Sequence, residues 1–170
     1  MQTENDTDFT LKIKRVLDES VLPSKKSFLD VGYDLTLVKL LKVENGVYYY
    51  DTGIQIEPEF PYYCEVIARS SLGKTGWMLS NNVGIIDPNY RGNIIVALVK
   101  VVENAKDLEI PARVAQLIPR KLYNARIIEA EVLSETERRD TGGLGSQQFH
   151  VTNGLRPRAA LQLGQSRKEP

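Results

Sequence analysis

Short apolar runs, rich in β-branched and aromatic residues and separated by turn residues, are the feature of this sequence that most limits its fold. Within the runs, apolar residues alternate or continue over a few positions, and helical spacing is scarce. This pattern is typical of strands. It predicts an all-β sandwich or barrel, with strands at residues 10–16, 33–41, 47–57, 62–68, 93–102, 113–118 and 125–133.

Gly, Pro, Asn and Asp lie between several of these runs and predict turns at residues 44–46, 51–53, 57–58 and 87–92. The continuous apolar run at residues 94–99 predicts a strand covered on both faces. The one helix that we expect is short and begins near Ser70 and Ser71, whose side chains could cap it.

The length of 170 residues suits one domain. The strand pattern stops near Glu135, and a polar tail rich in glycine follows. We therefore expect a β-barrel domain at residues 1–134 and a mobile C-terminal arm and tail at residues 135–170.

Composition argues against several classes of partner and cofactor. Lys and Arg number 22, as do Asp and Glu, so no overall field favours nucleic acid or an anionic membrane surface. The single cysteine, Cys64, excludes an intrachain disulfide and a zinc site built on paired cysteines, and we expect it to be a small buried residue. The sequence has neither a basic, apolar leader nor an apolar segment of about 20 residues. We expect a cytoplasmic protein, and a nuclear one is possible.

Three segments could carry chemistry. Residues 81–92 predict a hairpin whose backbone could grip a planar base edge, with the Asp87 carboxylate at its tip and the Tyr90 ring three residues later. Arg69, Ser70 and Ser71 offer a guanidinium, hydroxyls and amides where a helix should begin, which suits anionic oxygens. A glycine-rich loop follows Arg139 and could close over a phosphate chain. Taken singly, the three segments are also consistent with a surface turn, a helix cap and a linker.

The order and spacing of these pieces resemble the trimeric dUTPase family across its five motifs, from about Asp30 to Ser146. The third motif, N-x-x-G-x-I-D-x-x-Y-x-G, is matched without a gap by residues 81–92 and is the most specific. The other four correspond to VGYDL at 31–35, RSSL at 69–72, RVAQLI at 113–118 and RDTGGLGSQ at 139–147. The resemblance implies a jelly-roll-like antiparallel β-barrel and a homotrimer whose active sites are shared between subunits.

The resemblance also implies Mg²⁺-dependent hydrolysis of dUTP to dUMP and pyrophosphate, which limits uracil in DNA and supplies dUMP for dTMP synthesis. Asp87 would be the base that activates water for attack at the α-phosphorus, a role worth about 10²- to 10⁴-fold in rate. Tyr90 would pack under the deoxyribose and exclude a 2′-hydroxyl. The uracil edge would be read by Asn81 and by the backbone of Gly84, Ile85, Ile86 and Ile95.

The triphosphate would be met by residues of three motifs, at Arg69, Ser70, Ser71, Gln116, Arg139 and Ser146. Gly145 of the fifth motif would also bind substrate. Leu144 would cover the base. Asp34 would orient Arg69 or metal-bound water. The resemblance implies no direct protein ligand for Mg²⁺, because the ion would be held mainly by the substrate phosphates and water.

Two departures from the family pattern keep another class of function open. Leu144 occupies the position of a base-stacking Phe, and Asp140 stands where Gly is usual. A nucleotide-binding or regulatory protein without efficient turnover therefore remains an alternative. A second alternative is dCTP deaminase, a relative with the same type of fold, but it needs a glutamate where Ala97 stands and usually has Trp in place of Tyr90. Zinc-dependent deamination is excluded, because one Cys and one His cannot supply its ligands.

Overall fold

The structure, a computed structural model, describes residues 9–134. Within these residues every strand pairing is antiparallel. No helix among them is long and apolar enough to cross a membrane. The elements are β1 (Leu11–Arg15), β2 (Tyr33–Leu37), β3 (Lys39–Glu44), β4 (Val47–Asp51), β5 (Ile54–Pro58), β6 (Tyr62–Ala68), the 3₁₀ helix η1 (Leu72–Thr75), β7 (Trp77–Leu79), β8 (Gly84–Ile86), β9 (Ile95–Lys100) and β10 (Ala112–Lys121).

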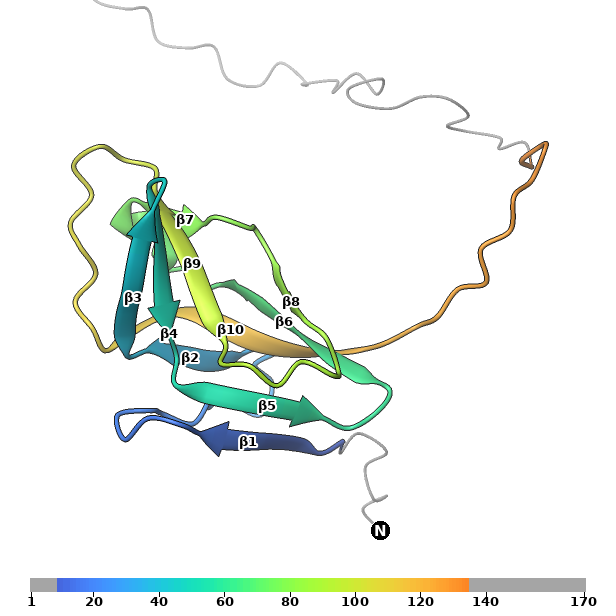
Figure 1. Ribbon diagram of the computed structural model, residues 1–170, viewed down its shortest axis with the longest axis horizontal. Helices are drawn as coiled ribbons and strands as arrows, with labels where there is room; N and C mark the ends of the chain where they lie inside the picture. Colours follow the sequence, from blue (N-terminus) through green and yellow to red (C-terminus); the bar gives the residue numbers. More distant parts are fainter. Residues whose placement is uncertain (1–8, 135–170) are drawn as a thin grey trace, which may run out of the picture. The chain divides into compact units, whose positions relative to one another are not determined.

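The strands form three sheets. One has four strands in the order β2-β10-β6-β8, a second has the order β3-β4-β9-β7, and the third pairs β1 with β5. Figure 1 shows β3, β4 and β9 side by side, and β1 alongside β5. Neighbours in a sheet are mostly distant in sequence, and the long strand β10 lies between β2 and β6. The expected all-β, jelly-roll-like fold class is confirmed.

Two of the expected strands are each divided between sheets. Residues 33–41 become β2 and the start of β3, and residues 47–57 become β4 and most of β5. At the second division the chain turns at Gly53, whose φ of +66° suits glycine. A Cβ there would lie 2.2 Å from Ser20 Oγ, so no larger residue fits. Alternating apolar residues continue through both corners, which is why periodicity alone did not reveal them.

Other boundaries also differ from expectation. The strands β7 and β8 were not expected, because three residues are too few to show a period. Residues 126–134 contain no strand or helix, so the strand expected at 125–133 is wrong for this chain. The run at 94–99 is buried on one face and only half-buried on the other. The turn at 44–46 is confirmed: Asn45 and Gly46, both with positive φ, join β3 to β4.

The expected helix is a single 3₁₀ turn of four residues. Ser71 is its N-cap residue, has helical φ and ψ, and makes no side-chain cap hydrogen bond. The expectation that these serines cap a helix is therefore wrong for Ser71. A turn this short also aligns too few peptide dipoles to attract an anion as a longer helix would. Any anion affinity near Arg69 must come from side chains and individual amides.

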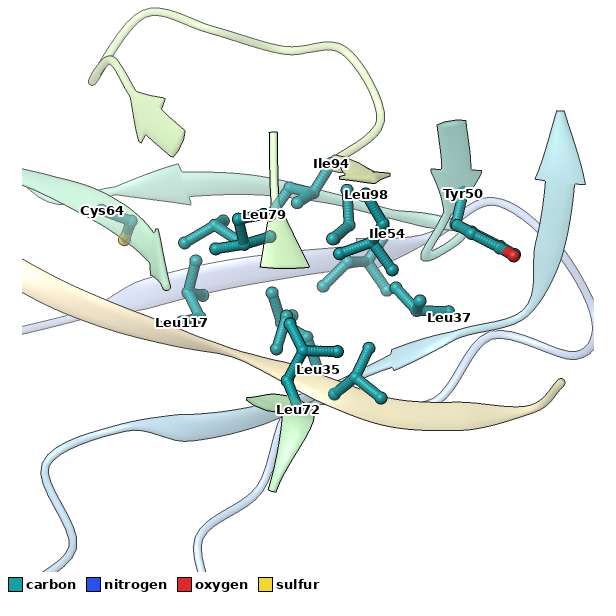
Figure 2. Close-up of a cluster of buried hydrophobic side chains, with 14 of the residues drawn as sticks. Leu35, Leu37, Tyr50, Ile54, Cys64, Leu72, Leu79, Ile94, Leu98 and Leu117 are labelled. Atoms are coloured by element: carbon teal, nitrogen blue, oxygen red, sulfur yellow. The ribbon is translucent and has the colours of Figure 1, made fainter. Parts of the chain in front are cut away.

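The core lies among the three sheets. Figure 2 shows side chains from many elements converging there, among them Leu35, Ile54, Leu98 and Leu117, none more than 1% exposed. Cys64 is also buried in this cluster, as expected. Burial raises the pKa of the Cys64 thiol to about 12, so the thiol stays protonated and unreactive near neutral pH.

Candidate active site

Three motifs meet at one end of the β2-β10-β6 sheet. Gln116 on β10 lies opposite Asp34 of β2 on one side and Ile67 of β6 on the other. Arg69 follows β6 and continues the ladder, since its amide donates to the carbonyl of Val114 (2.9 Å). A hollow of about 490 Å³ opens here, and its polar lining consists of Lys25, Lys26, Asp30, Asp34, Arg69, Ser70 and Gln116.

Asp34 fixes the Arg69 guanidinium. Arg69 Nε lies 2.9 Å from Asp34 Oδ1, and Arg69 Nη1 donates to the carbonyl oxygen of Arg113 (3.0 Å). Arg113 Nη1 approaches the other Asp34 oxygen at 3.9 Å. The Asp34 and Arg69 side chains are 24% and 34% exposed. The guanidinium is thus held at two points while one of its faces stays open to solvent, which suits a group that binds an anion from outside.

Gly32 makes room for the Gln116 side chain. A Cβ at Gly32 would lie 2.1 Å from Gln116 Oε1 and 2.7 Å from its Cδ. The Gln116 amide nitrogen donates to the carbonyl oxygen of Ala68 (3.3 Å). The glycine of the first motif is therefore explained by a close approach and not by a special φ.

The segment that carries the third motif differs from the expected hairpin. Residues 81–92 contain one strand, β8, which pairs with β6, whereas the strand after the turn, β9, pairs with β4 and β7 in another sheet. β8 is the edge strand of its sheet, so one side of its backbone has no partner strand among residues 9–134. Unpaired amides and carbonyls on such an edge can recognise another hydrogen-bonding group. The segment therefore still offers a backbone edge at Gly84, Ile85 and Ile86.

Asp87 begins a tight turn. The Tyr90 amide donates to the carbonyl of Asp87 (3.0 Å), with Pro88 at the second position, where its fixed φ is favourable. Arg91 Nη1 closes the loop through the carbonyls of Pro88 (2.7 Å) and Tyr90 (2.9 Å). The turn at 87–92 is confirmed, and it presents an exposed Asp87 carboxylate on a braced backbone.

The Tyr90 ring is fixed at its hydroxyl end. Tyr90 donates to the carbonyl oxygen of Asn93 (3.0 Å), and the ring lies against Gly92, where a Cβ would be 2.3 Å from the hydroxyl oxygen. The ring remains 42% exposed. It can therefore serve as a rigid wall for a bound group.

The described residues divide the candidate site between two places. Asp34, Arg69, Ser70 and Gln116 line the hollow, with Ser71 next in sequence. The other site residues lie on residues 81–92, the β8 segment, and at the start of β9: Asn81, Gly84, Ile85, Ile86, Asp87, Tyr90 and Ile95. Arg139, Leu144, Gly145 and Ser146 lie outside the described residues. Sequence reasoning missed the lining residues Lys25, Lys26 and Asp30, because they lie in a segment without periodicity.

The two places lie toward opposite ends of β6. Asp87 follows Ile86, which pairs with Cys64, whereas Arg69 comes five residues after Cys64. At about 3.3 Å per strand residue, the separation along β6 is roughly 17 Å. One chain does not bring Asp87 to the Arg69 cluster.

The donor atoms of the hollow fit Mg²⁺ bound to phosphate better than Mg²⁺ bound to the protein. Within residues 9–134 no three His, Cys, Asp or Glu side chains gather to hold a metal. The Asp34 carboxylate already faces two arginines. Cationic and amide groups such as Lys26, Arg69 and Gln116 suit phosphate oxygens, whereas Mg²⁺ needs oxygen ligands.

Comparison with known proteins identifies the family. A family model described as dUTPase matches residues 18–147. The curated deoxyuridine 5′-triphosphate nucleotidohydrolase of Nautilia profundicola is 36% identical over 138 residues, which are 80% of this chain and 96% of that protein. The same enzyme of Solanum lycopersicum is 32% identical over 146 residues, or 84% of each chain.

The chain belongs to the dUTPase family.

Solved dUTPases share the fold. The Staphylococcus bacteriophage 80alpha dUTPase, solved with dUpNHpp, superposes with a TM-score of 0.69 at 19% identity, covering 82% of this chain and 98% of that one. A mutant dUTPase of S. aureus phage phi11, which coordinates a structural Mg(II) ion, gives 0.61 at 16% identity, covering 74% and 99%. At these identities the likeness supports the dUTPase fold alone.

Proposed function

We propose that this dUTPase-family chain hydrolyses dUTP to dUMP and pyrophosphate, with Asp87 activating the attacking water. The family assignment makes the chain a dUTP diphosphatase. The observation that carries the proposed mechanism is the braced turn, which holds an exposed Asp87 carboxylate three residues before the fixed Tyr90 ring. A positioned carboxylate can take a proton from water within hydrogen-bond reach.

The β8 segment suits the nucleoside. We propose that Asn81 and the free backbone edge at Gly84, Ile85 and Ile86 read the uracil. The Asn81 amide already lies close to this edge, since a Cβ at Gly84 would be 3.4 Å from Asn81 Nδ2. Ile95 adds a main-chain contact, because β7 covers β9 only from Leu98 onward. We propose that the exposed Tyr90 ring packs under the deoxyribose.

The hollow at Arg69 suits the triphosphate. Arg69, Ser70, Ser71 and Gln116 would hold the phosphate oxygens, with Asp34 orienting the guanidinium. Lys25 and Lys26 lie on the same lining and add positive charge. Mg²⁺, held chiefly by the phosphates and water, would reduce the negative charge that attacking oxygen meets.

We propose that the site is built from more than one copy of the chain. Attack at the α-phosphorus needs the Asp87 water and the phosphate-binding groups within a few ångströms of one atom. The separation of roughly 17 Å along β6 prevents this within one chain. It supports a homotrimer in which the β8 segment of one subunit faces the hollow of another.

We also propose that residues 135–170 form a C-terminal arm, separate from the barrel, that completes the site. Arg139, Leu144, Gly145 and Ser146 would close over the base and the phosphates. The family match extends to residue 147 and so includes this motif. Exclusion of water by such closure favours reaction.

The test offers dUTP, dCTP, dTTP and UTP separately to the full chain with Mg²⁺ and measures pyrophosphate and ammonia. We expect pyrophosphate from dUTP alone, and EDTA should suppress its release. Ammonia from dCTP would mean deamination. If none of the four nucleotides gave pyrophosphate or ammonia while nucleotide binding was retained, the chain would be a binding protein.

The variant Asp87→Asn tests the base. It preserves the shape of the turn and removes the proton acceptor. We expect turnover to fall by about 10²- to 10⁴-fold while the dissociation constant for a non-hydrolysable dUTP analogue stays within about threefold of wild type. Undiminished turnover would remove Asp87 from the base role.

A further inference from the structure

We propose that Asn93 is a positioning residue that sets the discrimination between deoxyribonucleotides and ribonucleotides, by linking the Tyr90 ring to a buried carboxylate at Asp51. The inference rests on the proposed function, in which Tyr90 lies beneath the deoxyribose. It assigns the control of that ring to two residues, Asn93 and Asp51, that lie outside the five motifs.

Asn93 uses both ends of its side chain and its main-chain carbonyl at once. Its Nδ2 donates to Asp51 Oδ2 (2.9 Å), and its Oδ1 accepts from Gln55 Nε2 (3.1 Å). Its carbonyl oxygen accepts from the Tyr90 hydroxyl (3.0 Å). Asn93 therefore connects the corner between β4 and β5 with the exposed ring of the third motif.

The Asp51 end of this connection is rigid. Asp51 is 5% exposed and neighbouring Thr52 is 1% exposed. The second carboxylate oxygen of Asp51 accepts from the Gly53 amide (2.7 Å), and Thr52 Oγ1 donates to the Ile94 carbonyl (2.8 Å). Removing a hydrogen-bond donor from a buried carboxylate costs free energy. Hydrogen bonds to an ionised group are also short and strong. Asp51 therefore holds Asn93 more firmly than a surface contact would.

The Tyr90 ring is the exposed end of this connection. The ring is 42% exposed, and its only side-chain hydrogen bond among the described residues is the one to Asn93. Steric exclusion of a 2′-hydroxyl depends on the ring staying in place to within a fraction of an ångström. A shift of Asn93 would move its carbonyl, which accepts the hydrogen bond from the Tyr90 hydroxyl. The Tyr90 ring could then move aside and admit a ribose.

The competing interpretation is purely structural: the network stabilises the β4–β5 corner and has no effect on sugar selection. In that case variants would lower the thermal midpoint and would lower activity on dUTP and UTP in equal proportion. The ratio of kcat/KM for dUTP to that for UTP separates the two interpretations, because a general loss of folded enzyme leaves it unchanged.

The experiment first breaks the hydrogen bond between Asn93 and Asp51 and then restores it with donor and acceptor exchanged. Asn93→Asp places a carboxylate against the Asp51 carboxylate and breaks the link. The double variant Asp51→Asn with Asn93→Asp reverses donor and acceptor: the new amide donates to the new carboxylate, and the bonds from Gln55 and Gly53 are kept. We expect the dUTP-to-UTP ratio to fall by about tenfold in Asn93→Asp and to return to within about threefold of wild type in the double variant.

Two further variants make the result decisive. Asn89→Asp makes the same amide-to-carboxylate change in the same loop, at a position that the third motif leaves open, and should change the ratio less than about twofold. Tyr90→Phe removes only the hydroxyl that Asn93 binds, and should lower the ratio about as much as Asn93→Asp. Because the Tyr90→Phe change is at the surface, it gives a result even where Asn93→Asp does not fold.

The outcomes separate this inference from the proposed function. Wild-type protein that hydrolyses none of the nucleotides refutes the proposed function. Wild type that prefers dUTP, with an unchanged ratio in Tyr90→Phe or in folded Asn93→Asp, overturns the role of Asn93. An equal loss in Asn89→Asp would attribute the effect to charge alone and would also overturn it.

Discussion

Replacing Gly32 with alanine should impair catalysis while leaving the fold almost as stable as before. The added Cβ would lie 2.1 Å from Gln116 Oε1 and 3.0 Å from Gln116 Cγ. The clash is with the end of a flexible side chain, and φ at Gly32 lies outside the positive range. Gln116 can therefore move away, but it would leave the hollow that it lines and its bond to the Ala68 carbonyl (3.3 Å).

The sizes of the two effects differ. Losing the Gln116–Ala68 bond costs about 0.5–1.5 kcal/mol of stability, and the smaller entropy of an unfolded alanine returns about 0.4–1 kcal/mol. Losing a hydrogen bond to an anionic phosphate oxygen costs about 1.5–3 kcal/mol, which lowers kcat/KM for dUTP about 10- to 150-fold. We therefore expect a thermal midpoint close to wild type together with a large loss of kcat/KM.

The assay is pyrophosphate release over a range of dUTP concentrations, with thermal unfolding followed on the same samples. Gly73→Ala is the matched control, because a Cβ at Gly73 meets nothing within 4 Å. The double variant Gly32→Ala with Gln116→Ala should be no worse than Gln116→Ala alone, since both changes act through one side chain. Wild-type kcat/KM in Gly32→Ala, or losses that simply add in the double variant, would refute the reasoning.

Two further predictions follow from other contacts. Gly92→Ala should raise the KM for dUTP while changing the thermal midpoint little, because its Cβ would lie 2.3 Å from the Tyr90 hydroxyl oxygen and displace the ring. Steady-state kinetics and a melting curve test this. The hydrogen bond from Arg120 Nε (2.9 Å) lowers the pKa of Glu65 below its ordinary value of 4.5. Its stabilisation is thus present above that value and is lost as pH falls through the lower folded pKa. Glu65→Gln should remove this part of the loss of stability in acid. The effect should be under about 1 kcal/mol, because Arg120 is half exposed. Identical pH profiles of the thermal midpoint in wild type and Glu65→Gln would contradict the prediction.

Local signals in the sequence predicted most of the strands but not how they are shared between sheets. The strand at 62–68 matches β6 at both ends, because its β-branched and aromatic residues lie between turns. The corner at Gly53 escaped prediction because the apolar alternation continues through it, while the positive φ and the contact with Ser20 that require a glycine there arise only in the folded chain. Residues 125–133 have a strand-like pattern, yet no strand forms within the described chain, since a strand needs a neighbour as well as a pattern.

The candidate site was predictable where a motif is continuous and was missed where folding assembles it. In residues 81–92, Asp87 and Pro88 predict the turn that the hydrogen bond from Tyr90 to Asp87 closes. Lys26 and Asn93 could not be predicted, because their roles depend on contacts with residues distant in sequence. Lys26 lines the hollow, and Asn93 donates to Asp51. The expected helix cap at Ser71 failed for another reason: serine also favours turns, so the sequence cannot tell a cap from a short 3₁₀ turn.

Asp34 has a carboxylate in a hollow that should bind phosphates, and the structure indicates how this is compatible with anion binding. The hollow is lined by three cations, Lys25, Lys26 and Arg69, and by two carboxylates, Asp30 and Asp34, which leaves a net charge of +1. That surplus is too small for charge alone to explain affinity for a triphosphate. Asp34 instead holds the Arg69 guanidinium at 2.9 Å and faces Arg113 at 3.9 Å, so its own charge is largely compensated. A guanidinium fixed before the substrate arrives loses less side-chain entropy on binding. Asp34 therefore contributes by ordering a cation, at the expense of one unit of favourable charge.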